Sequence, residues 1–174
     1  VIREVDRMDG YVRDLLAYAR SEPYHLKPVD PQKVVDATLA KLKNAIDRNR
    51  ITVQTVDNRV SAKNVIADEM LLEQALTSIL TNAIEAMHDG GRLAVSFSPG
   101  ANKDNIRVEI ADSGRGISAE LLQRVSQSYF TTKPRGLGLG LELAKGIIER
   151  FQGRLEITSA PAIGTKVIID LKSA

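Results

Sequence analysis

Apolar residues along this chain recur at two spacings, one typical of helices and the other typical of strands. Steps of three and four residues predict four helices. The first, at residues 1–21, has a stripe like a coiled-coil seam, and the second begins at Asp30-Pro31, an N-cap followed by proline. The third helix runs from Asp68 to about Met87, and the fourth follows the glycines that end at Gly140. In chain order the four stripes are Val1, Val5, Met8, Val12, Leu15 and Ala19; Val35, Leu39, Leu42 and Ile46; Leu72, Leu76, Ile79, Ala83 and Met87; and Leu141, Ala144, Ile147, Ile148 and Phe151.

Alternating or short apolar runs between these helices predict strands. They cover residues 51–55, 65–67, 93–97, 106–110, 155–158 and 165–171. This order of helices and strands predicts an α+β fold, a two-layer sandwich whose mixed, mostly antiparallel sheet is covered on one face by helices. Pro23, Pro28 and Pro31 disfavour helix between the first two helical segments. We therefore divide the chain into an N-terminal helix at 1–22, a linker at 23–29 and one domain at 30–174.

Composition excludes several classes of function. With 24 basic and 22 acidic residues, the net charge of +2 is too balanced to favour nucleic acid as the main partner. The absence of cysteine excludes disulfides and thiolate metal sites. Two histidines, His25 and His88, argue against a multi-histidine metal site. No apolar run is long enough to span a bilayer, and the start within a helical pattern suggests a piece of a longer protein.

A glycine-rich loop, Gly136-x-Gly138-x-Gly140, runs directly into the fourth helix. Backbone N–H groups and the positive end of the helix dipole would face a ligand in this loop, and polyphosphate suits such a site. The spacing matches neither the phosphate-binding loop nor the dinucleotide fingerprint. Taken alone, these glycines also fit a flexible turn that caps a helix.

Other positions carry residues that could bind a nucleotide. Asn82, beside the stripe of the third helix, offers an amide oxygen suited to Mg²⁺, or is a core amide bonded to backbone. Glu85, one turn on, could join Asn82 at this site or lie on the surface.

Asp112 ends a strand just before Gly114 and Gly116, so its carboxylate could bind an amine of a base or simply close a turn. Candidates for hydroxyl donors and positive charge toward a triphosphate, or for a polar surface loop, are Thr131, Thr132, Lys133 and Arg135.

Together these motifs resemble the ATP-binding domain of sensor histidine kinases, whose wider group, with the Bergerat fold, includes DNA gyrase, the Hsp90 chaperones and the MutL repair proteins. The resemblance covers residues 30–174, and residues 1–22 look like the second helix of the family's dimerisation and phosphotransfer hairpin. The residues of the motifs most resemble those of kinases of the nitrogen-regulation type. The matching motifs follow the family's order and approximate spacing and are Asn82, Asp112-x-Gly-x-Gly116, Phe130-Thr-Thr-Lys133, Gly136-x-Gly-x-Gly140 and Gly164-Thr165.

The resemblance implies a role for each matched position. Asp112 would bind the adenine amino group, with Gly116 and Thr165 lining the base pocket. Asn82 would hold Mg²⁺ against the phosphates and, with Lys133, would serve catalysis. Residues 113–139 would form a lid over ATP. The remaining residues implied in nucleotide binding are Gly114, Thr131, Thr132, Arg135, Gly136, Gly138, Leu139 and Gly140.

Two departures from the family's pattern affect the expected chemistry. Ser78 lies about one turn before Asn82, where the gyrase and Hsp90 relatives carry the glutamate that activates water. Since serine is a poor general base, we expect slow hydrolysis and transfer to a positioned nucleophile. No His-Glu or His-Asp pair lies on an N-terminal helix, so the phosphoacceptor is expected outside this sequence.

We therefore expect the catalytic domain of a two-component sensor kinase. It would bind Mg·ATP and transfer the γ-phosphoryl to a histidine on a dimerisation domain, within a full-length homodimer, for relay to a response-regulator aspartate. The expected location is the cytoplasm, whether or not the parent protein is membrane-bound. The alternatives are a serine kinase of the anti-sigma-factor kind, against which the stripe at 1–21 argues, and a nucleotide-binding regulatory module without transfer activity.

Overall fold

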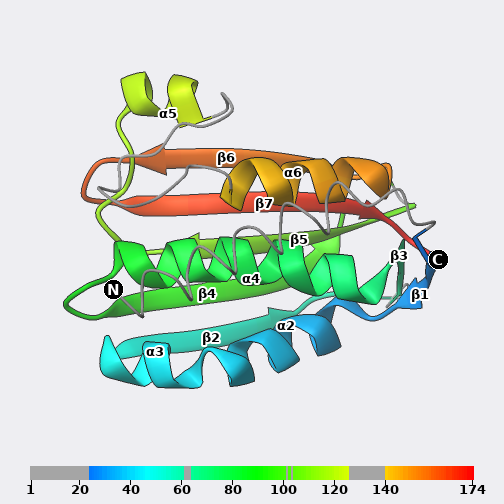
Figure 1. The fold of residues 1–174 in the computed structure, drawn as a ribbon, viewed down its shortest axis with the longest axis horizontal. Helices are drawn as coiled ribbons and strands as arrows, with labels where there is room; N and C mark the ends of the chain where they lie inside the picture. The colour runs from blue at the N-terminus through cyan, green and yellow to red at the C-terminus, as the bar shows by residue number, and fades with distance from the viewer. Residues whose placement is uncertain (1–23, 61–63, 101, 103, 126–139) are drawn as a thin grey trace, which may run out of the picture.

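A five-stranded sheet forms one layer of the molecule (Figure 1). The structure, a computed structural model, describes residues 24–60, 64–100, 102, 104–125 and 140–174. Strand β2 runs parallel to β4, and the other neighbouring strands of this sheet are antiparallel, which confirms the predicted mixed sheet. In spatial order the strands are β2 (Ile51–Asp57), β4 (Gly91–Pro99), β5 (Asn105–Asp112), β7 (Gly164–Lys172) and β6 (Arg154–Ala160).

Helices form the second layer, on one face of the sheet (Figure 1). In Figure 1, α4 (Glu69–Ala86) lies between α6 (Gly140–Arg150) and α2 (Pro31–Lys41). Helix α3 (Lys43–Arg48) lies beside α2 at the lower left, and α5 (Ala119–Val125) lies at the upper left, above β6. The covered face is apolar and buried, as at Leu93, Val95 and Phe97 of β4. None of the helices in the described ranges is both long enough and apolar enough to cross a membrane.

Helix α4 follows the predicted pattern closely. Its N-cap Asp68 accepts hydrogen bonds from the backbone N–H groups of Met70 and Leu71, which otherwise have no partner inside the helix. The predicted stripe is buried against the sheet and α6, and the helix ends at Ala86, one residue before the predicted limit. The four stripe residues within the helix, which are Leu72, Leu76, Ile79 and Ala83, therefore determine which face of α4 packs against the core.

The second predicted helix differs from the observed structure. The chain leaves the helix at Leu42, which caps α2 at its C-terminus and precedes α3. Leu39 and Leu42 of the predicted stripe are half-buried against the core, whereas Val34 and Thr38 are buried. The Thr38 hydroxyl donates to the carbonyl of Val34 at 2.7 Å, so this polar side chain is satisfied in the core.

A second, two-stranded sheet joins the segment before α2 to the body of the domain. Strand β1 (Lys27–Val29) pairs antiparallel with β3 (Val65–Ala67), although its sequence reads as linker. The backbone N–H of His25 donates to the N-cap carboxylate of Asp68 at 3.0 Å. The predicted N-terminal helix at residues 1–21 lies outside the described residues.

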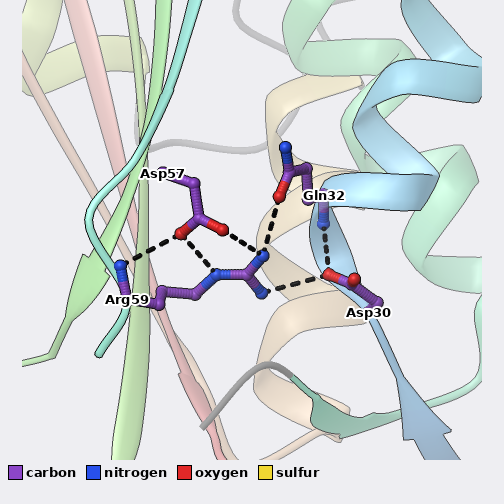
Figure 2. Close-up of polar contacts among 4 residues, drawn as sticks. All are labelled: Asp30, Gln32, Asp57 and Arg59. Carbon is purple, nitrogen blue, oxygen red and sulfur yellow. Dashed lines mark hydrogen bonds and ion pairs between the residues drawn. The ribbon is translucent and has the colours of Figure 1, made fainter. Parts of the chain in front are cut away.

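A buried arginine connects the end of β2 to the start of α2 (Figure 2). The Arg59 guanidinium donates to Asp57 Oδ1 at 2.8 Å, to Asp30 Oδ1 at 3.0 Å and to Gln32 Oε1 at 2.9 Å. Its Cζ lies 5.0 Å from the centre of the Phe97 ring. The hydrogen bond to Asp57 raises the pKa of Arg59, although burial acts in the opposite direction. Asp30 Oδ1 also accepts a hydrogen bond from the N–H of Gln32 and so caps α2. One carboxylate therefore caps the helix and binds the arginine that follows β2.

Candidate functional site

Asp112 lies at the end of β5, directly opposite Thr165 at the start of β7. Its Oδ1 accepts a hydrogen bond from the N–H of Gly114 at 2.8 Å and another from the N–H of Thr165 at 3.3 Å. The first bond closes the turn after β5, and the second crosses to the neighbouring strand. The structure therefore holds the carboxylate in one orientation and brings Asp112, Gly114 and Thr165 together as expected.

The charge of Asp112 is only partly compensated. Burial raises the pKa of this half-buried carboxyl, and the hydrogen bonds from the amides of Gly114 and Thr165 oppose that rise. In the part of the chain that the structure describes, no basic side chain forms an ion pair with Asp112. A half-buried carboxylate without a cation partner is a favourable acceptor for a ligand's N–H group.

Two glycines near Asp112 adopt backbone conformations that other residues rarely adopt. Gly116 has φ +66° and Gly164 has φ +124°. A Cβ on Gly116 would lie 1.9 Å from the carbonyl oxygen of Ala160, and one on Gly164 would lie 1.9 Å from that of Asp112. The backbone segments that would surround a base therefore approach each other as only glycine allows.

Ser159 near the end of β6 is a member of this cluster that the sequence reasoning missed. Its Oγ accepts from the N–H of Ile117 at 2.8 Å, donates to the carbonyl of Gly164 at 2.8 Å, and lies 2.9 Å from Thr165 Oγ1. The predicted strand ended at Thr158, two residues before the observed end of β6 at Ala160. Extending the alternation by one residue and pairing the last two strands about Gly164 would have placed Ser159 opposite Thr165.

Asn82 and Gly140 meet where α4 packs on α6. A Cβ on Gly140 would lie 2.6 Å from Ser78 Oγ, so a larger residue at the start of α6 would displace that side chain, whereas it would lie at an ordinary contact distance of 3.6 Å from Asn82 Nδ2. Within the described residues, no group of three or more acidic, histidine or cysteine side chains could hold a metal ion. The amide oxygen of Asn82 fits a Mg²⁺ ion whose other ligands are phosphate oxygens and water, while the N-terminus of α6 favours the phosphates themselves.

Helix α4 is in contact with both parts of the site. Ser78 and Asn82 meet Gly140, while the carbonyl of Ala86 accepts a hydrogen bond from the N–H of Arg115 at 3.2 Å. Ser78 and Ala86 are two turns apart, about 12 Å along the helix axis. One rigid helix thus fixes the position of the turn after Asp112 relative to the start of α6.

The remaining predicted site residues lie outside the described residues. They are Thr131, Thr132, Lys133, Arg135, Gly136, Gly138 and Leu139. Of the proposed lid at 113–139, the structure describes residues 113–125, which include α5.

Comparison with known proteins identifies the class to which this fold and site belong. Residues 67–174, more than half of the chain, match the family described as histidine kinase-, DNA gyrase B- and HSP90-like ATPase. The chain therefore belongs to this ATPase family, as the catalytic ATP-binding domain of a two-component sensor histidine kinase.

Curated relatives agree with this assignment. The chain is 31% identical over 165 residues to the signal transduction histidine-protein kinase AtoS of Escherichia coli K12, covering 94% of this chain and 27% of AtoS. It is 33% identical over 164 residues to the sensor histidine kinase ZraS of Klebsiella oxytoca, covering 93% of this chain and 35% of ZraS. The chain thus spans about a third or less of these relatives.

Solved structures confirm the fold. A full-length ShkA structure in complex with AMPPNP superposes with a TM-score of 0.83 at 20% identity, over 97% of this chain and 36% of that one. The histidine kinase ThkA, solved in complex with the response regulator protein TrrA, gives a TM-score of 0.81 at 21% identity, over 99% of this chain and 49% of that one.

Proposed function

We propose that this domain binds Mg·ATP and transfers its γ-phosphoryl group to a histidine on a dimerisation domain, for relay to a response-regulator aspartate. The observation that carries the proposal is the Asp112 carboxylate, half-buried and oriented by the amides of Gly114 and Thr165. In this proposal it accepts a hydrogen bond from the adenine amino group. The family match and the relatives' names support the kinase activity.

The phosphate end of the nucleotide would lie at the start of α6. The N–H groups there have no partner within the helix and carry the positive end of its dipole, so they favour an anion. Asn82, next to Gly140, would supply an amide oxygen to Mg²⁺. The bound ion would neutralise charge that develops on the phosphoryl group. Lys133 and Arg135 would add positive charge.

The residues near the phosphates favour transfer over hydrolysis. Ser78 is the side chain closest to Gly140 on α4, and a hydroxyl does not remove a proton from water at neutral pH. A positioned imidazole needs no such base, because it is itself the nucleophile. The domain's contribution is then to hold ATP in the correct position relative to the incoming histidine.

Titration calorimetry with ADP tests the proposed binding site. Losing a hydrogen bond to a charged group costs about 1.5–3 kcal/mol, so Asp112→Asn should weaken binding at least tenfold while the fold stays intact. Asp104→Asn, an exposed carboxylate near the start of β5, is the matched control and should bind normally. Unchanged affinity in Asp112→Asn would remove this assignment.

A second titration tests the proposed metal ligand. Asn82→Ala should lose the part of ADP affinity that depends on Mg²⁺ and keep the part measured in chelator. Asn102→Ala, an exposed amide on the loop between β4 and β5, is the control and should retain both. A Mg²⁺ effect equal to that of the wild type would exclude Asn82 as a ligand.

Labelled ATP and a separately made acceptor helix distinguish the possible transfer reactions. Acid-labile phosphate on a histidine of that helix supports the proposed kinase. Acid-stable phosphate on a protein hydroxyl would instead indicate a serine kinase of the anti-sigma-factor kind. Nucleotide binding without any transfer would indicate a regulatory module. We place the reaction in the cytoplasm, where ATP and response regulators are available.

A further inference from the structure

We propose that Ser159 is a positioning residue of the nucleotide site, which orients the Gly164–Thr165 peptide group and through it the Asp112 carboxylate. This inference rests on the proposed function, since it concerns how tightly the same site holds a nucleotide. It adds a residue on β6 to the candidate site residues described above.

The Gly164–Thr165 peptide group is held at both ends. Its carbonyl oxygen accepts a hydrogen bond from Ser159 Oγ at 2.8 Å, and its N–H donates to Asp112 Oδ1 at 3.3 Å. Since a peptide group is planar, the direction of the C=O bond determines the direction of the N–H bond. Ser159 therefore acts on the N–H group that binds Asp112 without touching Asp112 itself.

This peptide group needs such support. Gly164 has φ +124°, in a region that only glycine enters easily, and glycine loses more conformational freedom on ordering than other residues. Its Cα hydrogens face the carbonyl of Asp112, where a Cβ would lie at 1.9 Å. A hydrogen bond to the Gly164 carbonyl restricts the residue at this point.

The proton of Ser159 also determines how the Thr165 hydroxyl is used. Serine has one O–H donor and two acceptor positions. The carbonyl of Gly164 takes the proton, and the N–H of Ile117 occupies one acceptor position at 2.8 Å. Thr165 Oγ1, 2.9 Å away, then donates to the remaining position. The hydroxyl of Ser159 thus uses its donor and both acceptor positions. It connects the end of β6 with the turn at Ile117 and with the start of β7.

The test compares Ser159→Ala with Ser159→Thr and with Thr158→Ala. Thr158 is an exposed hydroxyl residue on the same strand and serves as the control. ADP affinity is measured by calorimetry at a temperature where circular dichroism shows each variant fully folded. Removing the hydroxyl should weaken ADP binding about three- to tenfold, the effect expected if, of its hydrogen bonds, only the neutral one to the Gly164 carbonyl affects nucleotide affinity. Ser159→Thr, which keeps the hydroxyl, should restore at least half of that loss on a logarithmic scale.

Amide hydrogen exchange separates positioning from a general loss of stability. In Ser159→Ala the amides of Ile117 and Thr165 should exchange at least tenfold faster, while the amide of Ile169 in the middle of β7 should stay protected. A uniform increase in exchange, or ADP affinity equal to that of the wild type in Ser159→Ala, would overturn the inference. If the wild-type protein itself fails to bind ADP, the proposed function fails instead.

Discussion

Replacing Arg59 with methionine should destabilise the domain, although its contacts described above are with Asp30, Gln32, Asp57 and Phe97 and not with the residues of the candidate site. The side chain is 1% exposed and its guanidinium donates to two carboxylates and one amide (Figure 2). Methionine keeps an apolar side chain against Phe97 but removes the guanidinium that donates to Asp30 and Asp57. The guanidinium therefore contributes to the stability of the connection between the start of α2 and the end of β2.

The size of the effect follows from how exposed the two carboxylates are. Breaking a buried ion pair by removing one partner costs about 3–5 kcal/mol. The side chains of Asp30 and Asp57 are 19% and 24% exposed, so water partly compensates them after the change. We therefore expect the lower end, a loss of about 3 kcal/mol. For a chain of 174 residues this corresponds to a decrease in Tm of about 6–12 °C.

Urea unfolding followed by circular dichroism measures this loss. Arg92→Met, which replaces an exposed arginine at the start of β4, is the control and should change the free energy of unfolding by no more than about 0.5 kcal/mol. Adding Asp57→Asn to Arg59→Met should recover part of the loss, because it removes one of the two carboxylate charges that the guanidinium contacts in the wild type. If Arg59→Met stays within about 1 kcal/mol of the wild type, the cost of desolvating the arginine cancels its hydrogen bonds and our reasoning is wrong.

Three further substitutions test the site and the core. Because burial raises the pKa of Asp112, its contribution to stability is present at low pH and is lost as the pH rises through that pKa. Asp112→Asn should therefore increase Tm at pH 7.5 but not at pH 3, by calorimetry at both values. Gly164→Ala should cost about 1–3 kcal/mol in urea unfolding, since it forces an alanine into a positive φ; an unchanged midpoint would refute the strain. Ile148→Ala, at a fully buried position, should cost about 2–5 kcal/mol, against little change for exposed Glu149→Ala.

The parts of the fold that could be predicted are those where local pattern and packing agree. The stripe from Leu72 to Ala83 predicts α4 because each of its residues faces the core. Strand β1 could not be predicted: Pro28 reads as linker, and only pairing with β3 makes this segment a strand. Arg59 is similar, since a charged residue just after a strand reads as exposed and only tertiary contacts bury it.

The candidate site shows the same limit. Asp112 and Thr165 could be named because they match a family's motifs, not because their spacing of 53 residues predicts a contact. Ser159 matches none of the family's motifs, so it could have been identified only from the strand register. The sequence predicts that register only to within a residue or two. The residues of the glycine-rich loop keep their predicted roles as proposals.

If Asp112 binds nucleotide as proposed, its pairing with Thr165 links nucleotide binding to the cooperativity of folding. Each of these residues belongs to a different hairpin, β4–β5 or β6–β7, which can form from neighbouring sequence alone. The Asp112 carboxylate and the Thr165 amide meet only when the two hairpins pair, so under the proposed function a partly folded chain would lack this binding site for adenine. A nucleotide present at a hundred times its Kd would then add about 2.7 kcal/mol to global stability, and hydrogen exchange throughout the sheet would slow together.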